Sequence, residues 1–352
     1  MALRAGAVRA VPSARAHHRA ARRAAATVAR ASEEAVEAEV VEAEVVEEAA
    51  PPPAPAPEPV LLAEEPTTGG MRLRDNNPQR FSVAEGSLGA VVGASLPFVL
   101  RLGTGALCHG YSVTVVDDVP GVYSFQHGLP GGRMVKETSA VSSLPRPAQP
   151  IVLYEFEGCP FCKKVREAVC ILDLDVEFRP CPQGGETYRP EAKERGAKAF
   201  PYMVDPNTGE EFGESDDIID YMFAKYGPGE VPTALRLPGG LTAVTIGLGL
   251  IGRAGAGSRK DASAVGVPPP AKPLEVWGYE PSPFSKLVRE ALNELELPHV
   301  LHPTGRGSPN RDTVYAKHGL FQAPYLEDPN TGECMFESQD IIAYLKERYG
   351  KK

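Results

Sequence analysis

The sequence predicts an α/β protein built from two tandem copies of one unit, without an all-helical domain after the second copy. Three observations support this prediction: an internal repeat, the order of strand and helix patterns within each copy, and a first segment whose composition opposes a packed core. The chain has 352 residues, of which 42% are hydrophobic and 24% are charged, as is ordinary for a soluble globular protein. The formal net charge of −9 disfavours a general nucleic-acid binder.

The internal repeat pairs residues 151–227 with residues 274–350 at a constant offset of 123 and without a gap. Of the 77 paired positions, 29 are identical, and the identities cluster. For example, Glu214-Ser215 recurs as Glu337-Ser338. Clustered identities at one offset are typical of a duplicated structural unit. We therefore predict module one at residues 147–228 and module two at residues 270–350.

The pattern within module one predicts each element in turn. Short apolar runs indicate strands, and apolar residues at helical spacing after Pro160 indicate a helix, since proline is tolerated in a first turn. Residues 206–209 read Pro-Asn-Thr-Gly, which favours a hairpin turn. The expected strands are Ile151–Phe156, Val176–Arg179, Tyr202–Asp205 and Glu211–Gly213, and the expected helices are Pro160–Leu172 and Asp216–Tyr226. This order, β-α-β followed by β-β-α, predicts a thioredoxin-like sheet with helices packed on it.

Two N-terminal segments have biased compositions. Residues 1–32 contain seven arginines and no acidic residue, which is typical of an organelle transit peptide. Residues 28–31, Val-Ala-Arg-Ala, resemble a plastid processing site, so we expect a chloroplast location, with the mitochondrion as the alternative. Residues 33–66 carry eleven glutamates, no basic residue and a proline-rich stretch, which predict a disordered acidic tether.

A similar leader precedes each module, at residues 67–146 and 229–269. Each contains an apolar, glycine-rich stretch that is shorter than the ~20 residues a membrane-spanning helix needs. Residues 97–102 and 232–237 share the pattern Pro-x-x-Leu-Arg-Leu and are interpreted as equivalent. Three interpretations of a leader stay open: it docks on a module, it docks on a membrane surface, or it is a partly ordered connector. Nothing in the sequence favours docking on a membrane.

The chemistry of module one centres on Cys159-Pro160-Phe161-Cys162, between the first expected strand and the first expected helix. Unpaired N–H groups and the dipole at a helix N-terminus stabilise a thiolate there, and Lys163 and Lys164 are expected to add to this. Cys159 is predicted to be an exposed nucleophile, and Cys162 the thiol that resolves a mixed disulfide. The alternatives are half of a zinc site or a structural pair. No further Cys or His pair stands at ligand spacing, so we expect no metal.

With a proline before the third strand and Glu-Ser-x-Asp at the last helix, module one resembles glutaredoxins and the N-terminal domain of glutathione transferases. The resemblance implies that Pro201 is cis, that Phe200 bonds the glutathione backbone, and that Glu214-Ser215 holds the γ-glutamyl end. In module two it implies the same of Ala323-Pro324 and Glu337-Ser338. An ordinary helix N-cap is the alternative interpretation of Glu-Ser-x-Asp.

Residues 97–350 resemble plant and algal glutathione transferases that carry two N-terminal domains and lack the helical C-terminal domain. Without that domain, conventional conjugation is in doubt. Module two replaces both sulfurs by hydroxyls, at Ser282 and Ser285, and cannot form the equivalent disulfide. The resemblance implies that Ser282 stabilises bound glutathione thiolate, as in Ser-type transferases; the alternative is a module kept for structure or binding.

Together these features predict a glutathione-dependent thiol–disulfide oxidoreductase that acts through Cys159. Glutathione is the expected co-substrate, and disulfides or glutathionylated proteins are the expected partners. Three alternatives stay open: a non-catalytic glutathione-binding or interaction protein, a transferase that conjugates through Ser282, and a [2Fe–2S] carrier that uses Cys159 and glutathione. A sulfur at position 159 that is buried, or that lies beyond a peptide's reach of Pro201 and Ser215, would count against the enzyme and leave only a duplicated scaffold.

Overall fold

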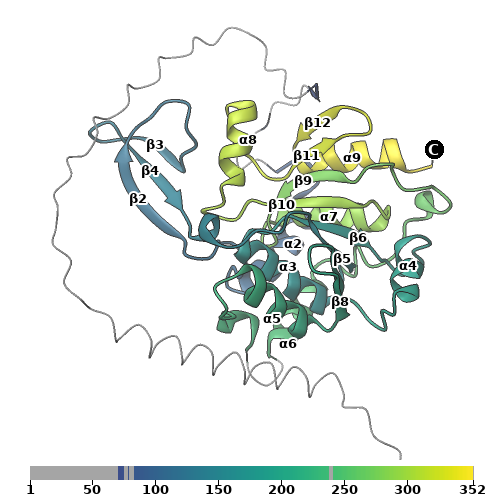
Figure 1. Ribbon diagram of the computed structural model, residues 1–352. Helices are drawn as coiled ribbons and strands as arrows, with labels where there is room; N and C mark the ends of the chain where they lie inside the picture. Colours follow the sequence, from purple (N-terminus) through teal and green to yellow (C-terminus); the bar gives the residue numbers. More distant parts are fainter. Residues whose placement is uncertain (1–69, 75–77, 79–82, 238–240, 352) are drawn as a thin grey trace, which may run out of the picture. The chain divides into compact units, whose positions relative to one another are not determined.

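The computed structural model of the protein describes residues 70–74, 78, 83–237 and 241–351, all within one unit of the chain, residues 64–352 (Figure 1). The predictions of a transit peptide at residues 1–32 and of a tether at residues 33–66 lie outside the described residues and stay predictions. Among the described helices, none combines the length and the apolar composition needed to span a bilayer.

Module one forms the predicted strands and helices with boundaries within one residue of those expected. One element, helix α4, was not expected, because its seven residues bury only Tyr188 and Ala192 and carry no apolar stripe that a sequence would display. The elements are β5 (Ile151–Glu155), α3 (Pro160–Leu172), β6 (Val176–Pro180), α4 (Tyr188–Glu194), β7 (Tyr202–Asp205), β8 (Glu210–Gly213) and α5 (Ser215–Tyr226).

Module two repeats this order of elements, as its sequence identity with module one predicts. Strands β5 and β6 are parallel, β7 is antiparallel to β5, and β8 is antiparallel to β7; β9 to β12 repeat this pattern. The elements are β9 (Leu274–Gly278), α7 (Pro283–Glu294), β10 (His299–Pro303), α8 (Asn310–His318), β11 (Tyr325–Asp328), β12 (Glu333–Phe336) and α9 (Ser338–Tyr349).

The two modules share one nine-stranded sheet, in the order β1-β12-β11-β9-β10-β6-β5-β7-β8. Strands β6 and β10 join the modules in antiparallel pairing, and Glu177 lies opposite Val300, its own equivalent at the offset of 123. The modules are therefore related by an approximate twofold axis through this pair. The short strand β1 (Arg72–Leu73) adds to the edge of module two, where Arg72 and Arg74 bind Glu333.

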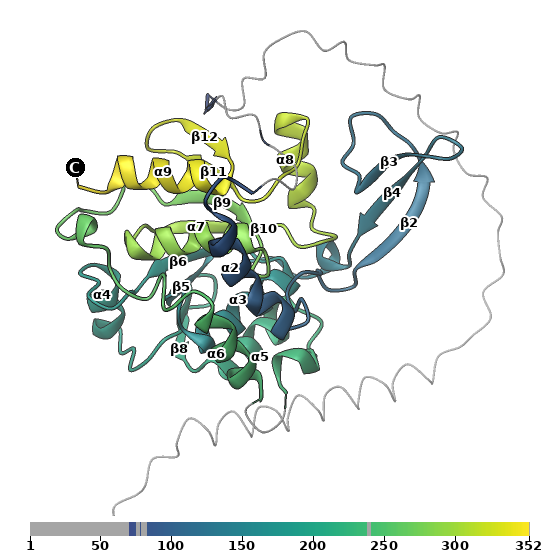
Figure 2. The same cartoon turned by 180° about the vertical axis from the view of Figure 1, so that it is seen from behind.

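Side chains on the two faces of the sheet form separate cores. On one face α3, α5, α7 and α9 pack over the strands of both modules in one continuous apolar cluster that includes Leu153 and Val276 (Figure 2). The neighbouring residues Tyr154 and Trp277 point to the opposite face, where α4 and α8 cover them. This alternation along each strand is why the short apolar runs are buried on both sides.

The leader at residues 67–146 is more ordered than the sequence suggests. It contains helix α2 (Leu88–Leu100) and a three-stranded antiparallel sheet of β2 (Ser112–Asp117), β3 (Gln126–Leu129) and β4 (Arg133–Thr138). Almost all of β2 is exposed, so no alternation of apolar and polar residues marks it as a strand. The buried carboxylate of Glu137 accepts from Tyr111 at 2.6 Å and from Arg306 of module two at 2.5 Å, which ties this sheet to the β10–α8 loop.

The predicted equivalence of residues 97–102 and 232–237 is wrong. Arg101, after α2, forms an ion pair of 2.7 Å with Glu167 of α3. Its counterpart is Arg253, after helix α6 (Leu241–Ile251), which pairs at 2.7 Å with Glu290, the equivalent of Glu167 in module two. Leu102 and Ala254 follow in the same left-handed conformation, each with φ of 49°. The repeated feature is thus a helix followed by arginine and a glycine-rich turn.

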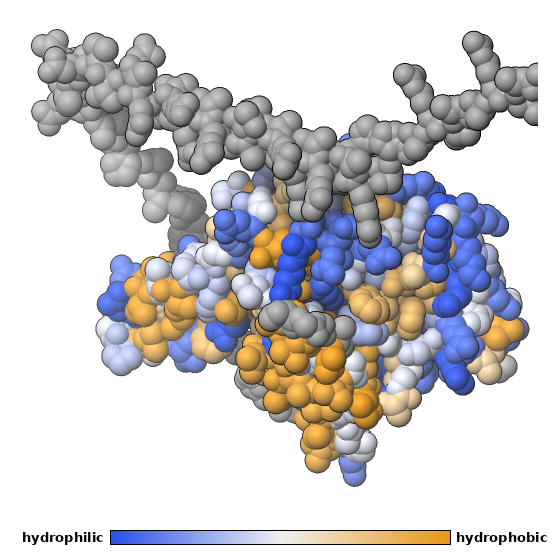
Figure 3. Space-filling view, turned by 90° about the horizontal axis from the view of Figure 1, so that it is seen from below, coloured by the Kyte–Doolittle hydropathy of each residue, from blue (hydrophilic) through white to orange (hydrophobic). Residues whose placement is uncertain are grey.

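Helices α2 and α6 pack against each other through small residues. A Cβ added at Gly93 would lie 2.3 Å from the carbonyl oxygen of Gly252, so only glycine allows this approach. Several large apolar side chains of the two helices, including Leu88, Val92 and Ile251, are exposed. In the space-filling view from below, apolar side chains gather on one protruding lobe (Figure 3).

A prediction about pH arises at the junction between the modules. His302 donates to Glu275 at 2.7 Å and to Asp175 of module one at 3.1 Å, and although burial alone would lower its pKa, these carboxylates raise it to about 9. A raised pKa stabilises the fold fully below the unfolded value of ~6.5, and this contribution is lost as the pH rises through about 9. We expect His302→Gln to lower the free energy of unfolding by about 1–2 kcal/mol at pH 6, and by much less at pH 10. Urea unfolding of both proteins at the two pH values tests this; an equal difference at both would contradict it.

Candidate functional site

Cys159 lies where β5 gives way to α3, and it is the N-cap residue of that helix. Its backbone is extended, and the backbone N–H of Cys162 donates to its Sγ atom at 3.2 Å. Pro160 occupies the first turn, where the missing N–H costs nothing. The Cys-Pro-Phe-Cys sequence therefore places one sulfur at the positive end of a helix and the second sulfur one turn inside it.

The pKa values of the two thiols are shifted in opposite directions. The Cys162 thiol and then its N–H lower the pKa of Cys159 below its ordinary value, although burial opposes this shift. Burial, followed by the hydrogen bond with Cys159, raises the pKa of Cys162 well above its ordinary value. Of the two thiols, Cys159 is therefore the one that ionises first as the pH rises. Lys163 and Lys164 are not aimed at the sulfur: Lys163 binds Glu280 at 2.6 Å, and Lys164 binds Asp216.

The prediction of an exposed nucleophile is wrong, because Cys159 is only 4% exposed, and this burial counts against the enzyme interpretation. Its thiol lies 3.6 Å from the carbonyl oxygen of Phe200, which covers one side. On the neighbouring residue, Gly158, an added Cβ would lie 1.8 Å from the hydroxyl of Ser258. Ser258 belongs to the segment after α6, which the sequence indicates only as linker. Docking of that segment on the loop before Cys159 is the physical reason for the difference.

Pro201 and Pro324 both follow cis peptide bonds, after Phe200 and Ala323 respectively. Each precedes the strand that lies antiparallel to the first strand of its module, β7 beside β5 and β11 beside β9. In module one this arrangement brings the Phe200 carbonyl to the Cys159 sulfur. Phe200, which the resemblance predicts to bond the glutathione backbone, therefore lies beside the thiol.

Glu214 and Ser215 lie at the start of α5, the helix that closes module one. Glu214 adopts a left-handed φ of 70°, its equivalent Glu337 has φ of 66°, and neither side chain caps its helix. The N-cap alternative for Glu-Ser-x-Asp is thus wrong for the glutamate side chains. Ser215 is buried as the first helical residue, and the ion pair of Asp216 with Lys164 holds this helix start beside the start of α3.

A hollow of about 290 Å³ opens beside the start of α3. Its walls are Phe161 and Lys164 of α3 and Asp216 of α5, and its cover comes from the second leader, including Arg236 and Ile246. Arg236 and Ile246 are residues that sequence reasoning missed, because nothing in a linker-like composition indicates that it lines a site. The thiol, the cis-proline loop, the start of α5 and this hollow lie together at one end of module one.

Both modules match a known domain family. Residues 153–230 and residues 277–352 each match the model of the glutathione S-transferase N-terminal domain. A 77-residue stretch of the chain is also 34% identical to the glutathione S-transferase-like protein gedE of Aspergillus terreus. That stretch is 22% of this chain and 34% of gedE, so the chain spans about a third of the length of this curated relative. No solved structure matches the chain.

Module two repeats the geometry without sulfur. Ser282 is the N-cap residue of α7, and its Oγ atom accepts from the N–H of Ser285 at 3.1 Å. Ser282 is 3% exposed. The Ser285 hydroxyl is buried and finds no hydrogen-bond partner within the described part of the chain. Gln322, just before the cis bond, donates to Glu337 at 2.6 Å, so this carboxylate is engaged within its own module.

The other four cysteines, Cys108, Cys170, Cys181 and Cys334, are buried and free. Burial is the largest cause that raises the pKa of each, to about 12 for Cys170. Cys159 is therefore the described thiol whose pKa is lowered. No group of three or more His, Cys, Asp or Glu side chains in the described residues is arranged to hold a metal ion.

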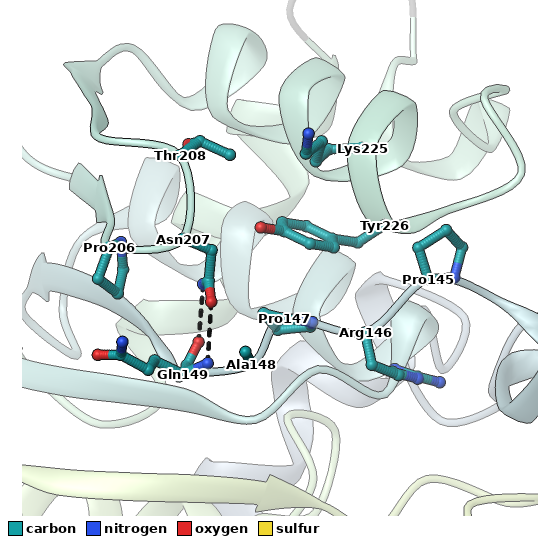
Figure 4. A pocket seen from close by; sticks show the side chains of 10 residues that line it. All are labelled: Pro145, Arg146, Pro147, Ala148, Gln149, Pro206, Asn207, Thr208, Lys225 and Tyr226. Atoms are coloured by element: carbon teal, nitrogen blue, oxygen red, sulfur yellow. Dashed lines mark hydrogen bonds between the residues drawn. The ribbon is translucent and has the colours of Figure 1, made fainter.

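A larger hollow, of about 700 Å³, lies at the far end of α5 from the thiol pair. Figure 4 shows that Asn207 and Gln149 join across it by two hydrogen bonds and that Tyr226 lies on its wall. The guanidinium of Arg146 is engaged by the carbonyl oxygens of Leu172 and Asp173. No cysteine lines this hollow, so its size alone does not make it the reactive site.

Proposed function

We propose that the protein is a glutathione-dependent thiol–disulfide oxidoreductase that acts through Cys159. The observation that carries the proposal is the pair of thiols one helical turn apart, the first with a lowered pKa and the second with a raised pKa. A low-pKa thiol is both a good nucleophile at neutral pH and a good leaving group in thiol–disulfide exchange. The match of both modules to the glutathione S-transferase N-terminal domain supports glutathione as the co-substrate.

In the proposed reaction the Cys159 thiolate attacks the glutathione sulfur of a glutathionylated protein. A sulfur–sulfur bond forms between Cys159 and glutathione, the protein–glutathione bond breaks, and the protein leaves as a thiolate that takes up a proton. A second glutathione thiolate then attacks the sulfur of the bound glutathione. This step releases glutathione disulfide and returns Cys159 to the thiolate, so glutathione supplies both electrons.

The proposed seat for the tripeptide runs from the Phe200-Pro201 bond to the start of α5. The Phe200 carbonyl is already beside the sulfur. The N–H groups at the start of α5 and the Ser215 hydroxyl suit the γ-glutamyl carboxylate, while Glu214 or Asp217 suits its ammonium group. The hollow of about 290 Å³ next to Phe161 offers space beside this seat for part of the second substrate.

The first test is glutathione-dependent reduction of a small mixed disulfide by the full chain and by Cys162→Ser. Since Cys162 resolves the intermediate only when glutathione does not, we expect the variant to keep at least about half of the activity, by a monothiol route. Activity of the parent that is indistinguishable from the uncatalysed rate would contradict the proposal. A variant without activity beside an active parent would show that Cys162 does more than resolve the intermediate.

The alternative of glutathione binding without turnover applies best to module two, because Ser282 is not a thiol and has no neighbouring thiol, so it cannot take part in thiol–disulfide exchange. Conjugation through Ser282 would require reaction of an electrophile with glutathione in the Cys159→Ser variant. We expect no such reaction above the uncatalysed rate. Glutathione-dependent conjugation by that variant, measured with a general aromatic electrophile, would favour the Ser-type transferase instead.

A further inference from the structure

Charged side chains of both modules meet at the twofold axis on the helical face of the sheet. Each is at most 3% exposed, so none is solvated and each must be paired within the protein. Burial alone would raise the pKa of Glu157 and Glu280, yet the surrounding cations hold Glu157 well below its usual range and Glu280 at about 2. We call this group the axial cluster, and it comprises Glu155, Glu157, Lys163, Arg166, Glu280, Lys286 and Arg289.

In the axial cluster, a glutamate of each module forms ion pairs with cations of the other module. The carboxylate of Glu157, in module one, accepts from Lys286 at 2.7 Å and from Arg289 at 3.1 Å, both on α7 of module two. Reciprocally, Glu280 of module two accepts from Lys163 at 2.6 Å and from Arg166 at 2.8 Å, both on α3. The loop before each helix N-cap is therefore held by the helix of the other module.

The backbone N–H groups of the two loops also bind the helix of the other module. The N–H of Glu157 donates to the Asn293 side chain on α7 at 3.2 Å. The N–H of Glu280 donates to the sulfur of Cys170 on α3 at 3.2 Å, and Cys170 and Asn293 are equivalent at the offset of 123. Each loop is thus fixed at a carboxylate and at an N–H by one helix of its neighbour.

Only one of these loops leads to a thiol. Glu157 is followed by Gly158 and then by Cys159, whose lowered pKa depends on its position at the start of α3. Gly158 has no space for a side chain on the Ser258 side, so the loop lies between Ser258 and α7. Two residues are too short a connection to move Glu157 without moving the sulfur.

We propose that module two is the positioning partner of the redox site, with Lys286, Arg289 and Asn293 as the positioning residues that hold the loop before Cys159 and so keep its sulfur at the start of α3. Module two lacks sulfur, yet its α7 helix provides the contacts that fix the loop of module one. This proposal rests on the proposed function and gives module two a role in it, which is to keep Cys159 in its reactive position. It concerns the thiol itself and not the turnover.

Lys286→Met is the primary test, because two effects then act in the same direction. The loop loses one of its anchors, and the Glu157 carboxylate, two residues from the sulfur, is less well neutralised; both raise the Cys159 pKa. The thiolate absorbance of the full chain is titrated with pH, and the titration of Cys159→Ser in the same background is subtracted. We expect the Cys159 thiolate at pH 7 to fall to roughly a tenth of its parent level.

Arg253→Met is the matched control, since Arg253 also pairs with an α7 carboxylate, Glu290, but touches no residue of the Cys159 loop. Arg253→Met removes one positive charge that pairs with the same helix, α7, and should leave the Cys159 titration unchanged. Lys286→Arg should restore most of the thiolate. Asn293→Ala, which changes no charge, should also raise the Cys159 pKa, whereas Cys170→Ala, the equivalent change on the other loop, should not.

Equal Cys159 titrations in the parent, Lys286→Met and Asn293→Ala would overturn the proposal, as would equal shifts in Arg253→Met. If Lys286→Met does not fold, the Asn293→Ala and Cys170→Ala pair decides alone. The absorbance needs neither glutathione nor access to the sulfur. A protein that transfers no thiol but shows the Lys286 dependence would therefore refute the proposed function and leave this inference standing.

Discussion

Replacing Cys159 by serine is expected to abolish glutathione-dependent thiol transfer, with a loss on the order of a thousandfold or more. The hydroxyl of serine is not a nucleophile at neutral pH without a base, and the two neighbouring lysines, Lys163 and Lys164, are bound to carboxylates. The rate of glutathione-dependent disulfide reduction by parent and variant measures the effect. A second measurement is the amount of the intermediate, the mixed disulfide between Cys159 and glutathione, which the variant cannot form at this position.

Cys181→Ser is the matched control for this experiment. Cys181 lies in the same module, is equally buried, and its thiol donates to the Arg179 carbonyl, a bond that serine can also make. Burial raises its pKa, so it is not expected to react and its replacement should leave the rate unchanged. A Cys159→Ser protein that keeps the parent rate would refute the assignment of the nucleophile.

The second large effect is expected in stability, at Arg166. This guanidinium is 1% exposed and binds three carboxylates: Glu155 at its Nη1 atom, Glu157 at 3.1 Å and Glu280 at 2.8 Å. Arg166→Met would leave those charges buried with fewer partners, and breaking such a pair costs about 3–5 kcal/mol. Urea unfolding of the parent and the variant measures this loss.

Arg195→Met serves as the comparison, because Arg195 is 42% exposed and its ion pairs with Glu191 and Glu211 are solvated. Its replacement should cost less than about 1 kcal/mol. Arg166→Lys keeps the charge but loses the planar guanidinium, so its loss of unfolding free energy should lie between those of Arg166→Met and Arg195→Met. Equal losses for Arg166→Met and Arg195→Met would mean that the axial cluster does not hold the modules together.

Sequence patterns predict most of each module because its elements are marked by local signals. The helix after Cys159 has proline in its first turn and apolar residues at helical spacing, and its predicted limits, Pro160–Leu172, agree with the structure. The turn at residues 206–209 is marked by Asn207 and Gly209, and it joins β7 to β8. Such signals lie within one element and do not depend on what packs against it.

The contacts that decide the environment of the site are long-range and left no local signal. Pairing of β6 with β10 joins strands more than one hundred residues apart, and the alternation of Val176 and Phe178 is the same whether or not a partner strand is present. Ser258, which packs against Gly158 next to Cys159, lies in a glycine-rich stretch that is typical of a linker. Glu157 and Glu280 read as loop carboxylates, and only the fold reveals that each belongs to the other module's helix.

The pH dependence of alkylation of Cys159 in the folded full chain tests the central claim most directly, because it asks at once whether a sulfur that is 4% exposed can be reached and whether it is ionised. Peptide mass analysis assigns the modified residue. We expect native Cys159 to be alkylated first among the cysteines, with a midpoint below the ~8.5 of an ordinary thiol. Labelling of Cys159 only after denaturation, or a midpoint at or above that of an ordinary thiol, would contradict the account.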